Sequence, residues 1–184
     1  MIMPWPSCRS YLTKKFGKPV RKIPLNAGFS CPNRDGTKSS AGCTFCDNRS
    51  FSPVACSKET VLRQLREGIE RSGRRFEAFI AYLQPFTNTY APLERLRDLY
   101  ESIVEQQQVV GLAVGTRPDC FSEALYDYLE DLSKRTYLSI EIGLQTAHNA
   151  TLSRTNRNHT FAQFADAVTR LASRGIETVA HVMI

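Results

Sequence analysis

The chain has 184 residues, of which 42% are hydrophobic, and it carries a formal net charge of +6. This length and apolar content suffice for one folded domain with a sizeable core, and they argue against intrinsic disorder. No apolar stretch reaches the length of a membrane span, and the segment from Met1 to Cys8 has no signal-peptide core. Six cysteines without an export signal predict a cytoplasmic protein whose thiols bind metal or pack, with Cys8 and Cys120 as buried or incidental thiols.

The charge is concentrated in two short basic groups. They comprise Lys14, Lys15, Lys18, Arg21 and Lys22, and then Arg71, Arg74 and Arg75. Such groups are compatible with binding of a polyanion such as RNA. The alternative is that they form a solvated basic surface. We expect residues 1–22 to form an irregular, basic lead-in and residues 23–184 to form the core domain.

Strand-like and helix-like segments alternate along the rest of the chain. The expected strands cover 23–29, 76–83, 109–114, 137–144 and 178–184. The expected helices cover 58–72 with Ser57 as the cap, a segment from Pro92, a segment after Ser122, and a segment from Thr160 to Gly175. Thr160 and Gln163 have the spacing of a capping box. Alternation with short loops predicts an α/β fold of βαβ units around a parallel sheet.

Three cysteines lie between the first expected strand and the first expected helix, in a loop over 27–51 rich in Gly, Ser, Asn and Pro. Cys31, Cys43 and Cys46 have the spacing C-x11-C-x2-C, which indicates a bound metal centre. If three cysteines hold a four-iron cluster, one iron stays open to a substrate or cofactor. The alternative is a zinc-stapled binding module in which Cys56 supplies the fourth ligand.

The expected strand over 137–145 has two different faces. Leu138, Ile140, Ile142 and Leu144 form an apolar face, and Ser139, Glu141, Gly143 and Gln145 form the other. A carboxylate on that second face needs water, a ligand or a charged partner, because burying it unpaired is costly. Glu141 therefore points either to a ligand or to an ion pair with an arginine such as Arg117. Small residues on the neighbouring strand, Gly111, Ala113 and Gly115, leave room for a ligand or pack tightly.

Five segments together resemble a known family. They are Cys31-Pro-Asn-Arg-Asp-Gly with Gly42-Cys43-Thr-Phe-Cys46, Gln84-Pro-Phe-Thr-Asn-Thr-Tyr90, Gly115-Thr-Arg-Pro-Asp119, Glu141-Ile-Gly-Leu-Gln145 and Asn156-Arg-Asn-His-Thr160. The first resembles the cluster loop of radical SAM enzymes. The set resembles the YhcC-type group, which shares its catalytic-domain type with the Elongator catalytic subunit and the oxygen-independent coproporphyrinogen oxidases.

The resemblance implies a partial (β/α)6 barrel, similar to a TIM barrel but open on one side. It also implies a [4Fe–4S] cluster and S-adenosylmethionine as cofactors, and an electron donor such as flavodoxin or ferredoxin. The reduced cluster cleaves S-adenosylmethionine to a 5′-deoxyadenosyl radical, which abstracts hydrogen from a substrate that the sequence does not identify. By position, Cys31, Cys43 and Cys46 ligate the cluster, and the expected cofactor-binding residues are Phe45, Gln84, Thr87, Asn88, Glu141, Gln145, Arg157 and His159.

Two departures from the family pattern bear on these expectations. Asn158 stands where the family has glycine, and asparagine tolerates a positive φ better than most residues. The sequence also stops inside an apolar strand, the fifth or sixth of the barrel, before the family's Gly-Leu-Pro-Gly-type turn and a further strand. We therefore expect a C-terminally shortened form with weak cofactor affinity that self-associates through this strand. A third alternative is an electron carrier whose cluster irons are all ligated by the protein. The three-cysteine loop argues against this alternative.

Overall fold

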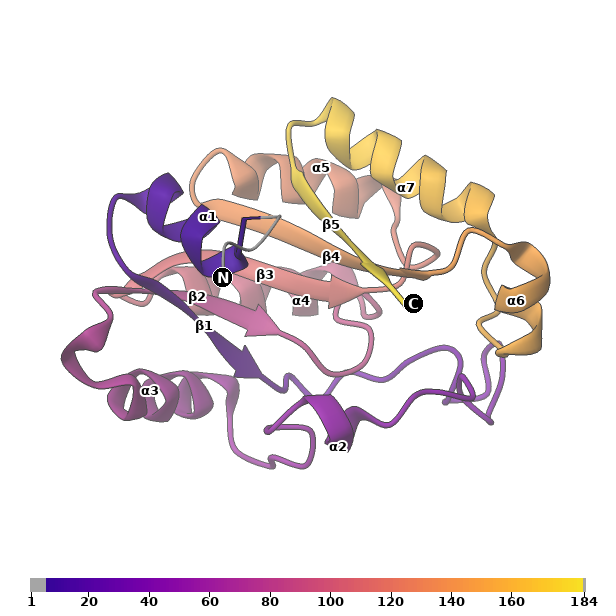
Figure 1. The fold of residues 1–184 in the computed structure, drawn as a ribbon, viewed down its shortest axis with the longest axis horizontal. Helices are drawn as coiled ribbons and strands as arrows, with labels where there is room; N and C mark the ends of the chain where they lie inside the picture. Colours follow the sequence, from indigo (N-terminus) through magenta and orange to yellow (C-terminus); the bar gives the residue numbers. More distant parts are fainter. Residues whose placement is uncertain (1–5, 184) are drawn as a thin grey trace.

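The computed structural model describes residues 6–183, and its centre is a five-stranded parallel sheet with the strand order β1-β2-β3-β4-β5 (Figure 1). The strands are β1 (Val20–Leu25), β2 (Ala78–Leu83), β3 (Val109–Thr116), β4 (Tyr137–Gln145) and β5 (Glu177–Val182). Every neighbouring pair is parallel. The prediction of βαβ units around a parallel sheet is therefore confirmed, and the sheet is open, as in a partial barrel.

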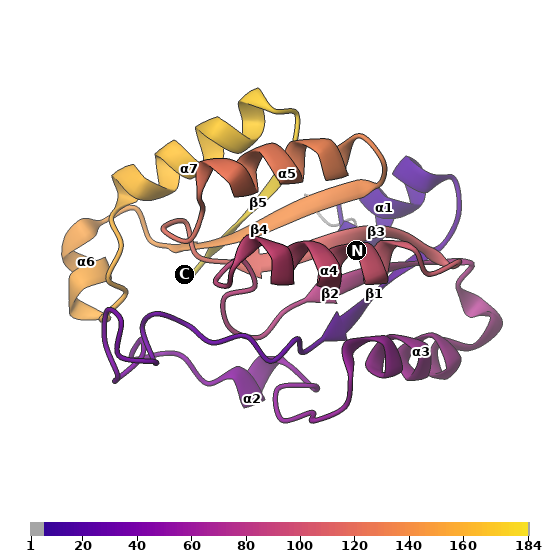
Figure 2. The same cartoon turned by 180° about the vertical axis from the view of Figure 1, so that it is seen from behind.

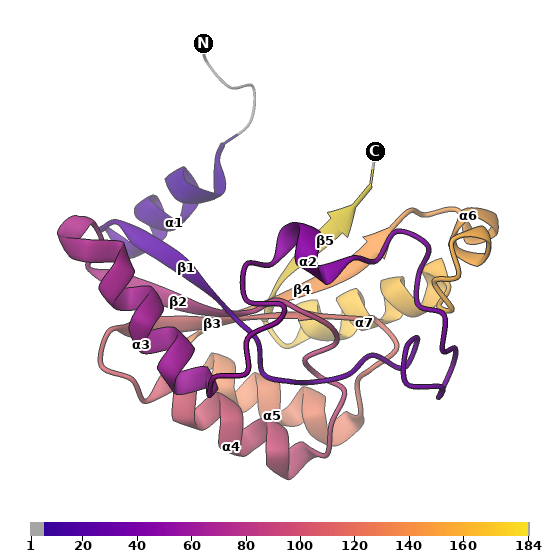
Figure 3. The same cartoon turned by 90° about the horizontal axis from the view of Figure 1, so that it is seen from below.

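Helices cover one face of this sheet (Figure 2). They are α3 (Val61–Ser72), α4 (Leu93–Val104), α5 (Glu123–Ser133) and α7 (Phe161–Ser173). Shorter elements are the helices α2 (Asn48–Phe51) and α6 (Asn149–Arg154) and the 3-10 helix η1 (Gly73–Arg75). The helix α1 (Cys8–Phe16) lies on the opposite side of the sheet (Figure 3), which we call the inner face.

The main hydrophobic core lies between the sheet and the covering helices. Ile140 and Ile142 of β4 are fully buried there, with helix residues such as Leu129 and Leu171. A smaller cluster on the inner face packs Leu12 of α1 against Ala78, Ile80 and Ala113. Because α1 covers only the amino ends of the strands, the inner face near their carboxyl ends is left to polar side chains.

The expectation of an irregular lead-in over 1–22 is wrong for the described part of that segment. Ser7 caps α1 by accepting a hydrogen bond from the Ser10 N–H (3.0 Å), and Gly17 ends the helix with a φ of 67°. The helix has no strong apolar period, so its packing on the sheet is visible only in three dimensions. Residues 1–5, which the expected lead-in includes, lie outside the described residues.

Several element boundaries also differ from the sequence-based expectations. The first strand spans 20–25 instead of 23–29, because Asn26 and Gly28 (φ 67°) form a turn. The helix expected over 58–72 begins at Val61 with Thr60, not Ser57, as its cap. The capping box of Thr160 and Gln163 and the cap at Ser122 are confirmed. The last expected strand includes Ile184, which lies outside the described residues.

The first basic group comes from the end of α1, the loop after it and β1, and the second comes from the end of α3 and from η1. Two members of the first group are paired, Lys15 with Glu177 and Lys22 with Glu141. A role of these groups in binding RNA stays a prediction. No helix in the described part of the chain is long and apolar enough to cross a membrane.

Candidate functional site

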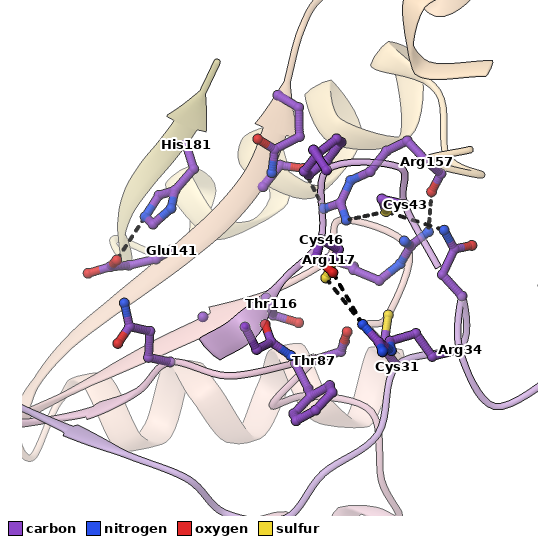
Figure 4. A pocket seen from close by; sticks show the side chains of 18 of the residues that line it. Cys31, Arg34, Cys43, Cys46, Thr87, Thr116, Arg117, Glu141, Arg157 and His181 are labelled. Carbon is purple, nitrogen blue, oxygen red and sulfur yellow. Dashed lines mark hydrogen bonds and ion pairs between the residues drawn. The ribbon is translucent and has the colours of Figure 1, made fainter. Parts of the chain in front are cut away.

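A cavity of about 410 Å³ lies at the carboxyl ends of the strands, between the cysteine loop and the inner face (Figure 4). Side chains that follow β2, β3 and β4 reach it because the carboxyl ends of parallel strands meet at one edge of a sheet. Its lining includes the three loop cysteines, together with Phe45, Gln84, Thr87, Glu141, Gln145 and Arg157. The structure thus brings together nine of the eleven site residues predicted from the sequence.

The cysteine loop presents its three thiols to this cavity. Cys43 is buried, Cys31 and Cys46 are half-buried, and all three are free thiols. Tight turns shape the loop, with the Arg34 N–H bonded to the Cys31 carbonyl (2.8 Å) and the Cys46 N–H to the Cys43 carbonyl (3.0 Å). Burial raises the pKa of the Cys46 thiol, and the nearby charges of Cys43 and Cys31 act in the same direction, while Arg34 opposes them.

Cys56, the fourth ligand that the zinc alternative requires, does not join the other three cysteines in the cavity. Cys56 is exposed. Among residues 6–183, no group of three or more His, Cys, Asp or Glu side chains is arranged so that it could hold one metal ion. A structural zinc needs four ligands within about 2.3 Å of a single ion. A four-iron cluster instead takes each cysteine on a different iron, so its thiols need not converge on one point.

Cationic and amide N–H groups point at two of the cysteine sulfurs. Cys43 Sγ accepts from Asn33 Nδ2 (3.4 Å) and from Arg157 Nη1 (3.6 Å). Cys46 Sγ accepts from Arg34 Nη1 (3.8 Å). Donors of this kind stabilise negative charge on sulfur. The surroundings therefore suit thiolate ligands.

The turn over 155–158 holds the cysteine loop in place. Asn156 Nδ2 donates to the Gly42 carbonyl (2.6 Å), and Asn158 Nδ2 donates to Asn33 Oδ1 (2.8 Å). The Thr44 N–H also bonds to the Thr155 carbonyl (3.1 Å). Asn156 and Asn158 have φ values of 53° and 54°, so the prediction that Asn158 adopts a positive φ in place of glycine is confirmed.

The segment after β2 supplies three lining residues and one structural residue. Gln84, Phe86 and Thr87 line the cavity, and Thr87 Oγ1 is buried without a hydrogen-bond partner. Asn88 does not line it. Its Nδ2 group donates to the carbonyls of Leu83, Pro85 and Gly115 at 2.9 to 3.0 Å. Asn88 thus shapes the loop that presents Thr87.

Glu141 lies on the inner face as predicted, but its partners differ from the expected one. Its carboxylate accepts hydrogen bonds from Lys22 Nζ of β1 and from His181 Nε2 of β5 (2.8 Å). The predicted alternative partner, Arg117, is instead paired with Asp119 (2.9 Å). Burial opposes the charge of Glu141, but the bonds from His181 and Lys22 outweigh it and lower its pKa to about 2.

Arg157 and His159 form a second polar group beside the cysteines. Arg157 lines the cavity, whereas His159 is buried behind it. Arg157 Nε donates to His159 Nε2 (2.9 Å), and Arg157 Nη2 donates to the Gly143 carbonyl (2.9 Å). Burial and the charge of Arg157 lower the pKa of His159 to about 4. His159 is therefore neutral near pH 7 and holds Arg157 in position.

Buried polar atoms without partners test whether this cavity suits a polar cofactor. Among the described residues that line it, Asn48 Nδ2, Thr87 Oγ1 and Arg117 Nη1 are buried and have no hydrogen-bond partner. Such atoms are costly unless a ligand or water satisfies them. Together with three free thiols, they fit a metal cluster and a ligand rich in polar groups.

Several further residues of the cavity were not predicted as site residues. They are Asn33, Arg34, Asn48, Tyr82, Phe86, Thr116, Arg117, His181, Val182 and Met183. Lys22 was also missed. The period-2 rule could have found it, since Lys22 alternates with the core residues Ile23 and Leu25 on β1.

Comparisons with known proteins agree with this geometry. The sequence profile of the Radical SAM superfamily matches residues 31–184. YtqA of Bacillus subtilis (strain 168) is 40% identical over 176 residues, which are 94% of this chain and 55% of YtqA. YhcC of Escherichia coli (strain K12) is 40% identical over 174 residues, which are 94% of this chain and 56% of YhcC. The chain thus spans about half the length of the curated relatives it matches.

A solved structure has the same arrangement of strands and helices. Methanocaldococcus infernus Elp3 with an N-terminal deletion (1-46) superimposes with a TM-score of 0.58 at 19% sequence identity. The match covers 89% of this chain and 38% of that one. At this level of identity the likeness shows a shared fold.

Proposed function

The chain belongs to the radical SAM superfamily and is of the YhcC type, and from this premise we propose that it is an enzyme that abstracts hydrogen from its substrate. The cofactors of this superfamily are a [4Fe–4S] cluster and S-adenosylmethionine. When bound, the reduced cluster would give one electron to S-adenosylmethionine, whose cleavage would provide a carbon radical for hydrogen abstraction. One observation carries the proposal: three free cysteines share a cavity with buried polar atoms that lack partners.

The cysteine loop supplies the cluster ligands in this proposal. Cys31, Cys43 and Cys46 would hold the cluster through three thiolates, which leaves it able to bind the cofactor. The turn over 155–158 fixes the loop through Asn156 and Asn158. Phe45, between Cys43 and Cys46, gives the cavity an apolar wall.

The remaining lining residues bind and orient S-adenosylmethionine. Glu141 is kept charged by Lys22 and His181, so it can accept hydrogen bonds from ribose hydroxyls. Thr87 and Gln84 lie at the end of β2, and in this proposal the unpartnered Thr87 Oγ1 bonds the methionine part. Gln145, at the end of β4, lines the same space.

The reaction consumes an electron, which an external one-electron donor such as flavodoxin or ferredoxin supplies. The cationic lining around the cysteines, with Arg34 and Arg157, suits an acidic donor of this class.

Product analysis tests the proposal. Anaerobically reconstituted protein is incubated with S-adenosylmethionine and dithionite, and 5′-deoxyadenosine and methionine are quantified by liquid chromatography and mass spectrometry. Both products are expected from the parent protein, and neither from Cys43→Ala. A protein that carries iron and sulfide, binds S-adenosylmethionine and yields no 5′-deoxyadenosine contradicts the proposal.

A further inference from the structure

Two cysteines of the loop each accept a hydrogen bond from an arginine, and a third arginine lines the same cavity (Figure 4). Arg34 lies in the cysteine loop and donates to Cys46 Sγ (3.8 Å). Arg157 lies in the turn before α7 and donates to Cys43 Sγ (3.6 Å). Arg117 directly follows β3 and lines the cavity together with the three cysteines.

Arg117 is the most deeply buried of the three, with 2% of its surface exposed. Its Nε and Nη2 atoms bind Asp119, both at 2.9 Å, and Nη2 also donates to the Arg157 carbonyl (2.9 Å). Asp119 in turn pairs with Lys38. The Nη1 atom is buried and has no partner, although the side chain lines the cavity. Arg117 therefore has a charged N–H donor at the cavity that no atom of the described residues accepts from.

The charged side chains around the cysteines are mostly positive. The described residues that line the cavity include the three arginines, and their only carboxylate is Glu141. Glu141 is already paired with Lys22 and His181. Asp119 offsets Arg117, but Lys38 offsets Asp119. The lining thus keeps a net positive charge next to the thiolates.

We propose that Arg34, Arg117 and Arg157 raise the reduction potential of the [4Fe–4S] cluster by placing positive charge and N–H donors around its sulfur ligands. The inference rests on the proposed function. Reduction adds one electron, which comes from the external one-electron donor, and leaves all bonds of the protein intact. Positive charge and hydrogen bonds to sulfur favour the form with the extra electron, so they raise the potential. The arginines thereby increase the fraction of the cluster that a donor can reduce.

The competing view is that the arginines only hold the loop in shape. Arg157 also bonds the Gly143 carbonyl and His159, so its loss can loosen the loop. Arg34 is different, because its side chain is exposed and its hydrogen bonds among the described residues go only to Cys46. Substitution of Arg34 therefore removes the charge beside Cys46 with fewer lost hydrogen bonds to the rest of the site than substitution of Arg157.

A redox titration followed by electron paramagnetic resonance, without S-adenosylmethionine, tests the inference. The variants are Arg34→Gln, Arg157→Gln and Arg157→Lys, with Arg66→Gln on the exposed side of α3 as the matched control. Iron and sulfide are quantified first, and only variants with parental cluster content are compared. For Arg157→Gln, we expect at least a tenfold shift of the reduction equilibrium toward the oxidised form, or about 59 mV for a one-electron couple.

The other variants are expected to shift the midpoint by smaller amounts. Arg157→Lys keeps the charge and is expected to shift the midpoint less than Arg157→Gln. Arg34→Gln is expected to shift it less than Arg157→Gln, and high salt should reduce its effect because Arg34 is exposed to solvent. Arg66→Gln should match the parent.

Unchanged or less negative midpoints in Arg34→Gln and Arg157→Gln, with full cluster content, overturn the inference. If Arg157→Gln loses its cluster, Arg34→Gln decides alone, since the side-chain hydrogen bonds of Arg34 go only to Cys46 among the described residues. A parent protein without iron and sulfide instead contradicts the proposed function, so the two failures are distinguishable.

Discussion

Lys22 and Glu141 form an ion pair across the inner face of the sheet, although β2 and β3 lie between their strands. Glu141 is 5% exposed, and His181 of β5 donates to its other carboxylate oxygen at 2.8 Å. Three strands far apart in the sequence thus converge on one carboxylate at the wall of the cavity. This arrangement fixes the charge and the position of the residue that we propose to bind ribose.

The ion pairs of Glu141 make stability depend on pH. The folded pKa is about 2, below the ordinary value of 4.5, so the stabilisation is complete above about pH 4.5 and is lost as the pH falls toward 2. Glu141→Gln should lower the free energy of unfolding at pH 7 by roughly 3 kcal/mol and weaken its pH dependence between 2 and 4.5. Urea unfolding at pH 7 and pH 3 measures both effects. Glu70→Gln, at an exposed position of α3, is the control, and equal pH profiles for parent and Glu141→Gln count against this assignment.

The same carboxylate should govern cofactor affinity. Loss of charge-assisted hydrogen bonds to the ribose costs about 1.5–3 kcal/mol each, so Glu141→Gln should weaken binding of S-adenosylmethionine at least tenfold. Equilibrium dialysis with the reconstituted protein gives the dissociation constant, and iron analysis gives the cluster content. We expect intact cluster content with weakened binding. Parental affinity in a fully loaded variant rules out the ribose contact.

A side chain at Gly143 is predicted to fit only if the ends of the Arg157 and Gln145 side chains move. A Cβ at this position would lie 2.5 Å from Arg157 Nη2 and 2.6 Å from Gln145 Nε2. Gly143→Ala should therefore displace Arg157 from Cys43 and expose the cluster. The rate at which the brown colour bleaches in air measures this exposure, and we expect it to increase several-fold. Bleaching at the parental rate would contradict the prediction that Gly143→Ala displaces Arg157 from Cys43.

The turn over 155–158 gives a test of backbone conformation. Asn158 has a φ of 54°, which glycine adopts freely and alanine adopts at a cost of about 1–2 kcal/mol. Both Asn158→Gly and Asn158→Ala lose the bond to Asn33, so their difference isolates the backbone term. We expect Asn158→Ala to unfold at a lower temperature than Asn158→Gly in differential scanning calorimetry. The reverse order contradicts the assigned conformation.

Local patterns in the sequence predicted much of this fold. Alternating apolar residues placed Glu141 and Gly143 on the inner face, and the capping box located the start of α7 at Thr160. Both features depend on residues a few positions apart. The helix α1 was missed, because Leu12 is its only buried residue and its stability comes from contact with the sheet.

The site was predicted less completely, and for a physical reason. The cysteines and Glu141 could be assigned from spacing and face, but the partner of Glu141 could not. Lys22 reaches Glu141 from 119 positions away in the sequence, and only the order of the strands brings them together. Asn88 and His159 lie in the expected segments, yet their side chains bond protein atoms behind the cavity wall. A motif thus locates a segment without fixing the direction of each side chain.

The content of iron and sulfide in cysteine variants tests the central claim most directly. Anaerobically reconstituted parent protein should be brown and contain four irons and four sulfides per chain, as a [4Fe–4S] cluster requires. Cys31→Ala, Cys43→Ala and Cys46→Ala should each lose this content. Cys56→Ala should keep it, because Cys56 is exposed and lies outside the cavity lining. A colourless protein that binds one zinc ion and needs Cys56 to do so would contradict the account.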